Sequence, residues 1–151
     1  MRIVRRSVHL ARRWWRSLPS TEPSTVDLEW VASILAPGER ELWGTMAVAD
    51  RRHSIEVARR FVRLLPQASR AATAAALLHD VGKSVASLST TGRVVATVVG
   101  ARGRRFRDYH RHEEIGLELC RRAGSCDETL AVLAGRGPDE VVAALRGADD
   151  I

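Results

Sequence analysis

A chain of 151 residues is long enough for one domain with one hydrophobic core. Hydrophobic residues make up 45% of the sequence and aromatic residues only 5%, and abundant Ala, Leu, Arg and Glu favour helices over strands. The formal charge of +6 arises in residues 1–20, which hold six arginines and no acidic residue. The rest of the chain is neutral by count, so the high pI does not indicate that the whole protein binds nucleic acid.

Residues 1–17 alternate arginines with Val, Leu, Ile and Trp side chains, which predicts a basic amphipathic helix. Such a helix suits peripheral contact with an anionic membrane surface or a partner, but it equally suits docking on its own domain. Nucleic-acid binding through this helix is a weaker interpretation, because it rests on one charge cluster. Pro19 and Pro23 among Ser and Thr residues predict a linker, so we expect a leader and linker at 1–24 and one domain at 25–151.

The sequence favours a cytoplasmic location. No run approaches the roughly 18 apolar residues that a membrane-spanning helix needs, and Arg12 and Arg13 interrupt any signal-peptide core. Cys120 and Cys126 form no CxxC pair, so we expect them to pack as thiols in a reducing compartment.

Helical spacing of apolar residues predicts an all-α fold along the rest of the chain. Residues 67–79 are rich in alanine, and such small side chains let neighbouring helices approach closely, so we place this helix at the centre of a bundle. The expected helices run from Asp27 to Leu35, from Glu39 to Leu65 with a bend near Asp50, and over 67–79, 109–123, 126–134 and 138–148, with a short helix favoured over a strand at 94–99.

His79 and Asp80 follow one another at the end of the alanine-rich segment. Burying an imidazole and a carboxylate there costs free energy unless a charged group receives them. Successive residues on a helix point about 100° apart, so both side chains reach one site only where the helix ends, and Gly82 gives the backbone that freedom. A divalent ion (Mn, Fe, Co, Ni, Zn or Mg) fits these ligands, although an isolated His-Asp pair is more often a polar helix end.

Three segments, in order, resemble the HD superfamily of metal-dependent phosphohydrolases, in an HDIG-like variant with the motif H…HDxGK…D. Residues 76–83 resemble the HDxGK signature, residues 50–58 the first-histidine helix, and residues 145–150 the closing helix that carries the last aspartate. The resemblance implies a compact helical bundle with one divalent metal, whose ligands are His53, His79, Asp80 and Asp149, with Asp150 as the alternative to Asp149.

The resemblance also implies a reaction. Lys83 matches a lysine that lies near the substrate phosphate in relatives, and Asp80 is expected to orient or deprotonate the attacking water. The expected function is hydrolysis of a small phosphomonoester or phosphodiester, a nucleotide among the candidates. The alternative is a non-catalytic HD module that binds a metal or nucleotide and acts in regulation.

Two further residues are candidate contacts to the substrate phosphate. Arg52 precedes His53 directly, and a guanidinium group suits phosphate because it donates two parallel hydrogen bonds. His112 occupies the ligand position of a segment, 109–116, that resembles the second-metal helix of some HD proteins. Those relatives carry a later His-His pair, where this chain has Leu133–Gly137, so one metal is expected and the role of His112 stays open.

Overall fold

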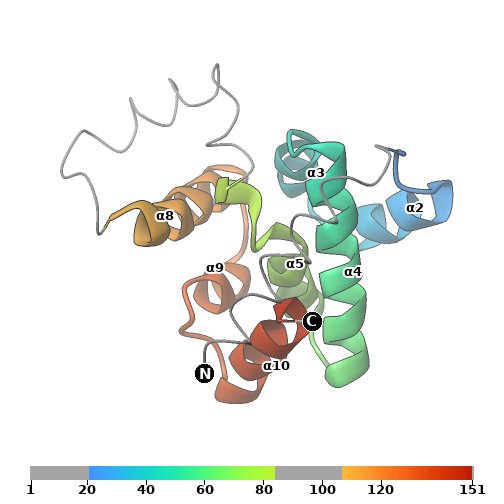
Figure 1. The fold of residues 1–151 in the computed structure, drawn as a ribbon. Helices are drawn as coiled ribbons and strands as arrows, with labels where there is room; N and C mark the ends of the chain where they lie inside the picture. The colour runs from blue at the N-terminus through green and yellow to red at the C-terminus, as the bar shows by residue number, and fades with distance from the viewer. Residues whose placement is uncertain (1–20, 84–106, 151) are drawn as a thin grey trace, which may run out of the picture.

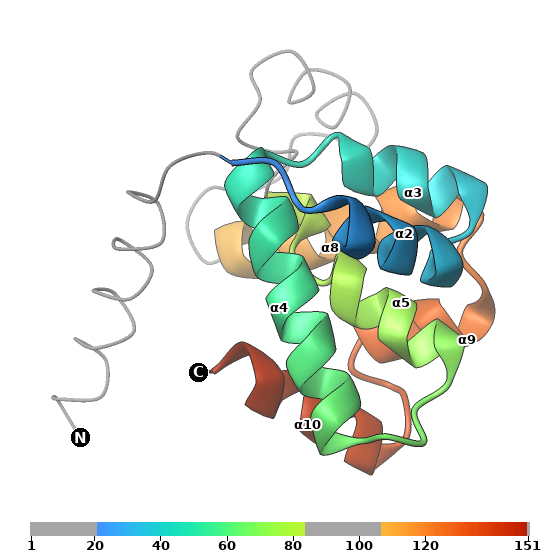
Figure 2. The same ribbon diagram turned by 90° about the vertical axis from the view of Figure 1, so that its right-hand side faces the viewer.

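The computed structural model describes residues 21–83 and 107–150, with the side chains of the second segment described from residue 113 onward. Both segments consist of helices and connecting turns without a strand, as expected for an all-α protein (Figures 1 and 2). The leader helix predicted at 1–17 and the short helix predicted at 94–99 lie outside these residues. The helices are α2 (Thr25–Ile34), α3 (Pro37–Gly44), α4 (Val48–Leu64), α5 (Arg70–Leu78), α8 (Arg107–Arg122), α9 (Asp127–Leu133) and α10 (Asp139–Asp149).

Helix α5 lies at the centre of the bundle, as its alanine content predicts. It begins after Ser69, whose hydroxyl accepts a hydrogen bond from the Ala72 amide at 3.0 Å. Every residue from Ala72 to Leu78 is buried. Helices α2, α3, α4 and α9 all pack against it, so the segment that ends in His79 is held from several sides.

A turn separates α3 from α4 at Thr45–Ala47, a few residues before the bend that we predicted near Asp50. The chain turns here because Thr45 bonds back to the Leu42 carbonyl with both its amide and its hydroxyl, which closes the helix end. The two helices remain connected through a buried hydrogen bond of 2.9 Å from Trp43 Nε1 to Ser54 Oγ. Ser54 is the neighbour of His53, so this contact helps to fix the part of α4 that carries the histidine.

Helix α10 packs along α4, while α9 packs against α5. Ala148 is fully buried, and a Cβ added at Gly147 would lie at an ordinary van der Waals distance of 3.8 Å from Leu64 Cδ1, so the C-terminal turn of α10 lies against α4. On another side, Gly116 of α8 approaches the backbone of Gly82, where an added Cβ would lie 3.2 Å from the Gly82 nitrogen. The ends of α5 and α10 and the first half of α4 therefore meet at one place.

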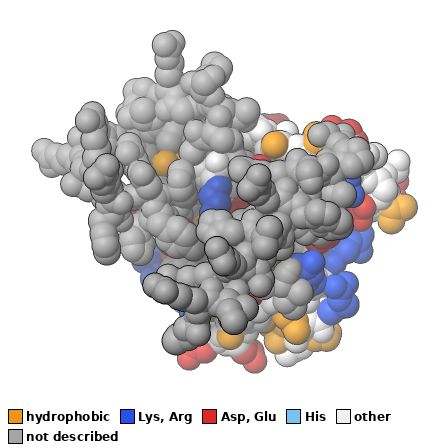
Figure 3. Space-filling model, in the orientation of Figure 1, with side chains coloured by type: hydrophobic (Ala, Val, Ile, Leu, Met, Phe, Trp, Pro, Cys, Tyr) orange, Lys and Arg blue, Asp and Glu red, His pale blue; other side chains and the backbone are white. Residues whose placement is uncertain are grey.

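None of the helices in the described part of the chain is long and apolar enough to cross a membrane. The face shown in Figure 3 presents both basic and acidic side chains, in keeping with the equal numbers of the two charges after residue 20.

Candidate metal centre

His79 is the residue at which α5 ends, and a turn at residues 79–80 precedes the helical residues 81–83. Its Nδ1 lies 2.8 Å from the Ala76 carbonyl oxygen, which only accepts hydrogen bonds, so Nδ1 carries the proton. In the neutral ring the lone pair is then on Nε2, the nitrogen that faces the other polar residues of the site. The ring is oriented and given the tautomer that a metal-binding histidine requires.

Nε2 of His79 is buried and makes no hydrogen bond with any part of the chain that the structure describes. Asp149 Oδ1 is 3.3 Å away, within ion-pair distance but without the geometry of a hydrogen bond. Buried polar atoms are rarely left without a partner. A metal ion bound at Nε2 would satisfy this atom, so the residues present fit a bound divalent ion.

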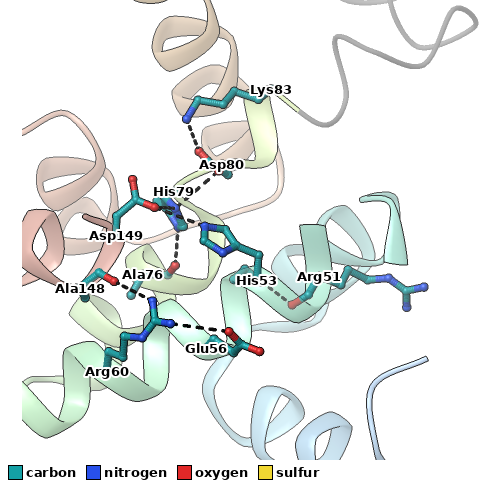
Figure 4. Close-up of polar contacts among 11 residues, drawn as sticks. Arg51, His53, Glu56, Arg60, Ala76, His79, Asp80, Lys83, Ala148 and Asp149 are labelled. Carbon is teal, nitrogen blue, oxygen red and sulfur yellow. Dashed lines mark hydrogen bonds and ion pairs between the residues drawn. The ribbon is translucent and has the colours of Figure 1, made fainter. Parts of the chain in front are cut away.

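His53 reaches the same point from α4, across the bundle (Figure 4). The centroids of the His53 and His79 rings lie 6.0 Å apart. One ligand atom each from His53, His79 and Asp80 lie within 4.8 Å of one another, so these three side chains are close enough to hold one ion.

Asp149 joins this cluster from the last residue of α10. Its Oδ1 lies 3.3 Å from Nε2 of both His53 and His79. A hydrogen bond from His53 and the adjacent charge of His79 lower the pKa of Asp149 well below its usual range. The neighbouring Asp150 is exposed and lines the adjoining cavity, so Asp149 is the aspartate that the structure brings to the histidines.

Asp80 is held on the other side of the cluster by Lys83. The Lys83 ammonium lies 2.6 Å from Asp80 Oδ1, and Asp80 Oδ2 lies 3.7 Å from His79 Nε2. Burial raises the pKa of Asp80, but the charges of His79 and Lys83 outweigh it and the net shift is downward. For His79, burial lowers the pKa, but the charges of Asp80 and Asp149 outweigh it and the net shift is upward.

A cavity of about 410 Å³ adjoins these residues, a size typical of small-molecule sites. Four carboxylates and two cations line it, so a divalent ion would balance the charge of the ionised side chains. Its aliphatic wall comes from the end of α9 and from one face of α10. The charged lining comprises Asp80, Lys83, Glu113, Arg146, Asp149 and Asp150 beside His79, and the aliphatic lining comprises Val132, Leu133, Ala134, Val142 and Leu145.

The two residues predicted to contact phosphate are placed differently. Arg52 is half-buried near Glu56, whose pKa is raised by burial against the opposing charges of Arg60, His53 and Arg52. It is not among the cavity-lining residues, so its role as a phosphate contact stays a prediction. The neighbouring Arg51 pairs with Glu22 at 3.0 Å and points away from the cluster (Figure 4). His112 belongs to α8, and its side chain lies outside the described residues.

Sequence reasoning missed Arg146, a cavity-lining cation. A signal was present, because Val142, Leu145, Arg146 and Asp149 recur at the spacing of one helix face. Once Asp149 is assigned to the site, this spacing places the other three on the same side.

The family model for the HD domain matches residues 51–146. The chain belongs to the HD domain family. The matched segment contains His53, His79 and Asp80 and ends before Asp149. No curated protein and no solved structure gives a significant match.

Proposed function

We propose that this HD domain is a metal-dependent phosphohydrolase that cleaves a phosphomonoester or phosphodiester, with nucleotides among the substrates to be tested. The observation that carries the proposal is the convergence of His53, His79, Asp80 and Asp149 beside a cavity that also contains Lys83. Imidazole with carboxylate is a ligand set for divalent ions from Mn to Zn. One such ion would be held by these four side chains.

A bound divalent ion supplies Lewis-acid polarisation of a phosphoryl oxygen and lowers the pKa of water. The side chains of this domain supply the rest. The charges of His79 and Lys83 lower the pKa of Asp80, so its carboxylate can accept a hydrogen bond or a proton from the attacking water. The Lys83 ammonium, 2.6 Å from Asp80, is placed to offset negative charge on the phosphate.

Arg146 is our second candidate for a phosphate contact. Its guanidinium has no hydrogen-bond or ion-pair partner among the described residues, and it lies on the same face of α10 as Asp149. A planar fork of donors suits phosphate better than a single ammonium group. We therefore expect Arg146→Met to raise KM for a phosphorylated substrate several-fold while the affinity for metal stays unchanged.

The test begins with metal analysis of the purified full chain. A screen of phosphatase and nucleotide substrates with added Mn²⁺, Ni²⁺, Co²⁺ or Mg²⁺ then follows. We expect turnover that requires metal and falls more than about 100-fold in Asp80→Ala, because that change removes a metal ligand and the proton acceptor together. Arg59→Met, which removes an arginine that pairs with Asp27 of α2, serves as the control and should keep full activity.

The alternative function is a non-catalytic HD module that binds a metal or nucleotide. The short ion pair between Lys83 and Asp80 favours this alternative, because the Lys83 ammonium that would contact the substrate phosphate is already paired with a carboxylate. Metal binding without turnover of any phosphorylated substrate would support the alternative, and absence of metal binding would contradict both functions. The cytoplasmic location and the membrane contact through residues 1–17 stay predictions, as does the phosphate contact of His112.

A further inference from the structure

The C-terminal turn of α10 carries Asp149. The last carbonyl groups of a helix have no partners within the helix, and they carry its partial negative charge. Asp149 is the final residue of α10, with Asp150 after it as the C-cap. A contact from elsewhere in the bundle is therefore needed to hold this turn in one position.

Arg60 of α4 makes that contact. Its Nη1 donates a hydrogen bond to the Ala148 carbonyl oxygen at 3.3 Å, and its Nη2 lies 3.7 Å from Glu56 Oε2 (Figure 4). A cation beside the C-terminus of a helix also interacts favourably with the helix dipole. The backbone that it binds directly precedes Asp149.

One face of α4 contacts both the Asp149 side chain and the backbone just before it. His53, Glu56 and Arg60 follow one another at the spacing of one helix face, so His53 contacts the Asp149 carboxylate while Arg60 contacts the backbone before it. Ala148 is fully buried where α10 packs along α4. The contact between Arg60 and the Ala148 carbonyl, two helical turns away from His53, thus bears on the distance between His53 and Asp149.

We propose that Arg60, oriented by Glu56, is a positioning residue that holds the end of α10 so that Asp149 reaches the metal. It touches neither the metal nor the substrate. The inference rests on the metal site of the proposed function and is independent of the proposed reaction.

The test compares Arg60→Met with Arg59→Met by titrating Mn²⁺ into the purified full chain in a calorimeter. Both variants remove a half-buried arginine from α4, but Arg59 points toward α2, where it pairs with Asp27 at 2.6 Å. We expect Arg60→Met to weaken Mn²⁺ binding about 10- to 100-fold, the usual effect of removing a residue that orients a ligand. Arg59→Met should bind as tightly as the wild-type chain.

Two further variants separate positioning from general loss of structure. Arg60→Lys keeps a charged donor for the Ala148 carbonyl and should recover at least half of the lost affinity on a logarithmic scale. In an Asp149→Asn background, Arg60→Met should have almost no additional effect, because the ligand that it positions is already impaired. Glu56→Gln, which removes the ion pair that orients Arg60, should weaken Mn²⁺ binding a few-fold and serves if Arg60→Met fails to fold.

Each outcome of these titrations supports or overturns the positioning role of Arg60. Wild-type affinity in Arg60→Met or in Glu56→Gln overturns the inference, as does an equal loss with and without the Asp149 carboxylate. A wild-type chain that binds no Mn²⁺ overturns the metal site and this inference together. A chain whose Mn²⁺ affinity depends on Arg60 in this way but that hydrolyses nothing overturns only the proposed reaction.

Discussion

The two sides of α4 carry charged side chains in contrasting surroundings. Toward α2, the Arg59 guanidinium pairs with Asp27 at 2.6 Å and lies 4.4 Å from the centre of the Trp30 ring. Asp27 also accepts a hydrogen bond of 2.8 Å from Ser24. Each charge on this side meets an opposite charge, a hydroxyl or an aromatic ring, so these groups satisfy one another without a ligand.

Toward α5 and α10, the charged groups do not satisfy one another in this way. Two carboxylates, of Asp80 and Asp149, lie beside the same imidazole, and Nε2 of that imidazole is buried without a hydrogen bond within the described segments. Two like charges around a buried nitrogen cost free energy, and a cation offsets this cost. Mutual pairing is typical of a structural surface, as on the α2 side, whereas incomplete pairing on the other side indicates a candidate binding site.

Removing a proposed metal ligand should give the largest difference in metal affinity between changes on the two sides of α4. We expect His79→Ala to weaken divalent-metal binding more than about 100-fold, because changes in residues that only orient a ligand already cost 10- to 100-fold. The measurement is titration calorimetry with Mn²⁺, with Arg59→Met as the matched variant on the α2 side. Equal affinities in the two variants would contradict the contrast between the sides.

Metal should stabilise the fold through one side only. At a free metal concentration of 100 times Kd, one-site binding to the native state adds about 2.7 kcal/mol, or roughly 5–10 °C in Tm for a chain of this size. Differential scanning fluorimetry should show this shift in the wild-type chain and in Arg59→Met, and none in His79→Ala. A shift that persists in His79→Ala would place the metal elsewhere.

Substitutions at Gly38 and Gly116 test two contacts at different distances from the proposed metal site. An added Cβ at Gly38 would overlap the Ala123 carbonyl oxygen, far along α8 from the site, whereas one at Gly116 would press on Gly82, two residues after Asp80. We expect Gly38→Ala to lower the free energy of unfolding by about 1–3 kcal/mol with little change in metal affinity. Gly116→Ala should cost less stability but weaken Mn²⁺ binding several-fold. Urea unfolding and calorimetry give the two quantities, and the reverse pattern would refute this assignment.

The smallest expected effect lies on the α2 side and depends on pH. The hydrogen bond from Ser24 and the guanidinium of Arg59 lower the pKa of Asp27, so its stabilisation is fully present above the unfolded-state pKa of about 3.9. It is lost as pH falls through the lower folded-state pKa. Asp27→Asn should therefore cost roughly 0.2–1 kcal/mol at pH 7, and progressively less on acidification below about pH 4. Urea unfolding at pH 7 and pH 3 measures both, and a difference that grows with acid would be inconsistent with this pairing.

Much of the site was predictable because its ligands sit in local patterns. The His79-Asp80 pair at the end of an alanine-rich helix, with Gly82 after it, indicates a polar site from the sequence alone. The central position of α5 followed from its small side chains. The resemblance to the HD pattern favoured Asp149 over Asp150, and the structure brings Asp149 to the histidines.

What could not be predicted depends on contacts between distant segments. Arg60 is one of many surface-type arginines until α10 packs against α4 and places the Ala148 carbonyl beside it. Arg51 and Arg52 adjoin His53 in sequence, yet Arg51 pairs with Glu22 because neighbours on a helix point in different directions. The turn at Thr45–Ala47 depends on capping bonds of Thr45 that leave no trace in apolar spacing.

The central claim is that four side chains from α4, the end of α5 and the end of α10 hold one metal ion. Anomalous diffraction from crystals of the full chain grown with Zn²⁺ tests it most directly. The account predicts one strong peak among His53 Nε2, His79 Nε2 and the carboxylates of Asp80 and Asp149, with ligand distances of about 2.0–2.2 Å. Absence of a peak at this point, or a peak bound by other residues, would contradict it.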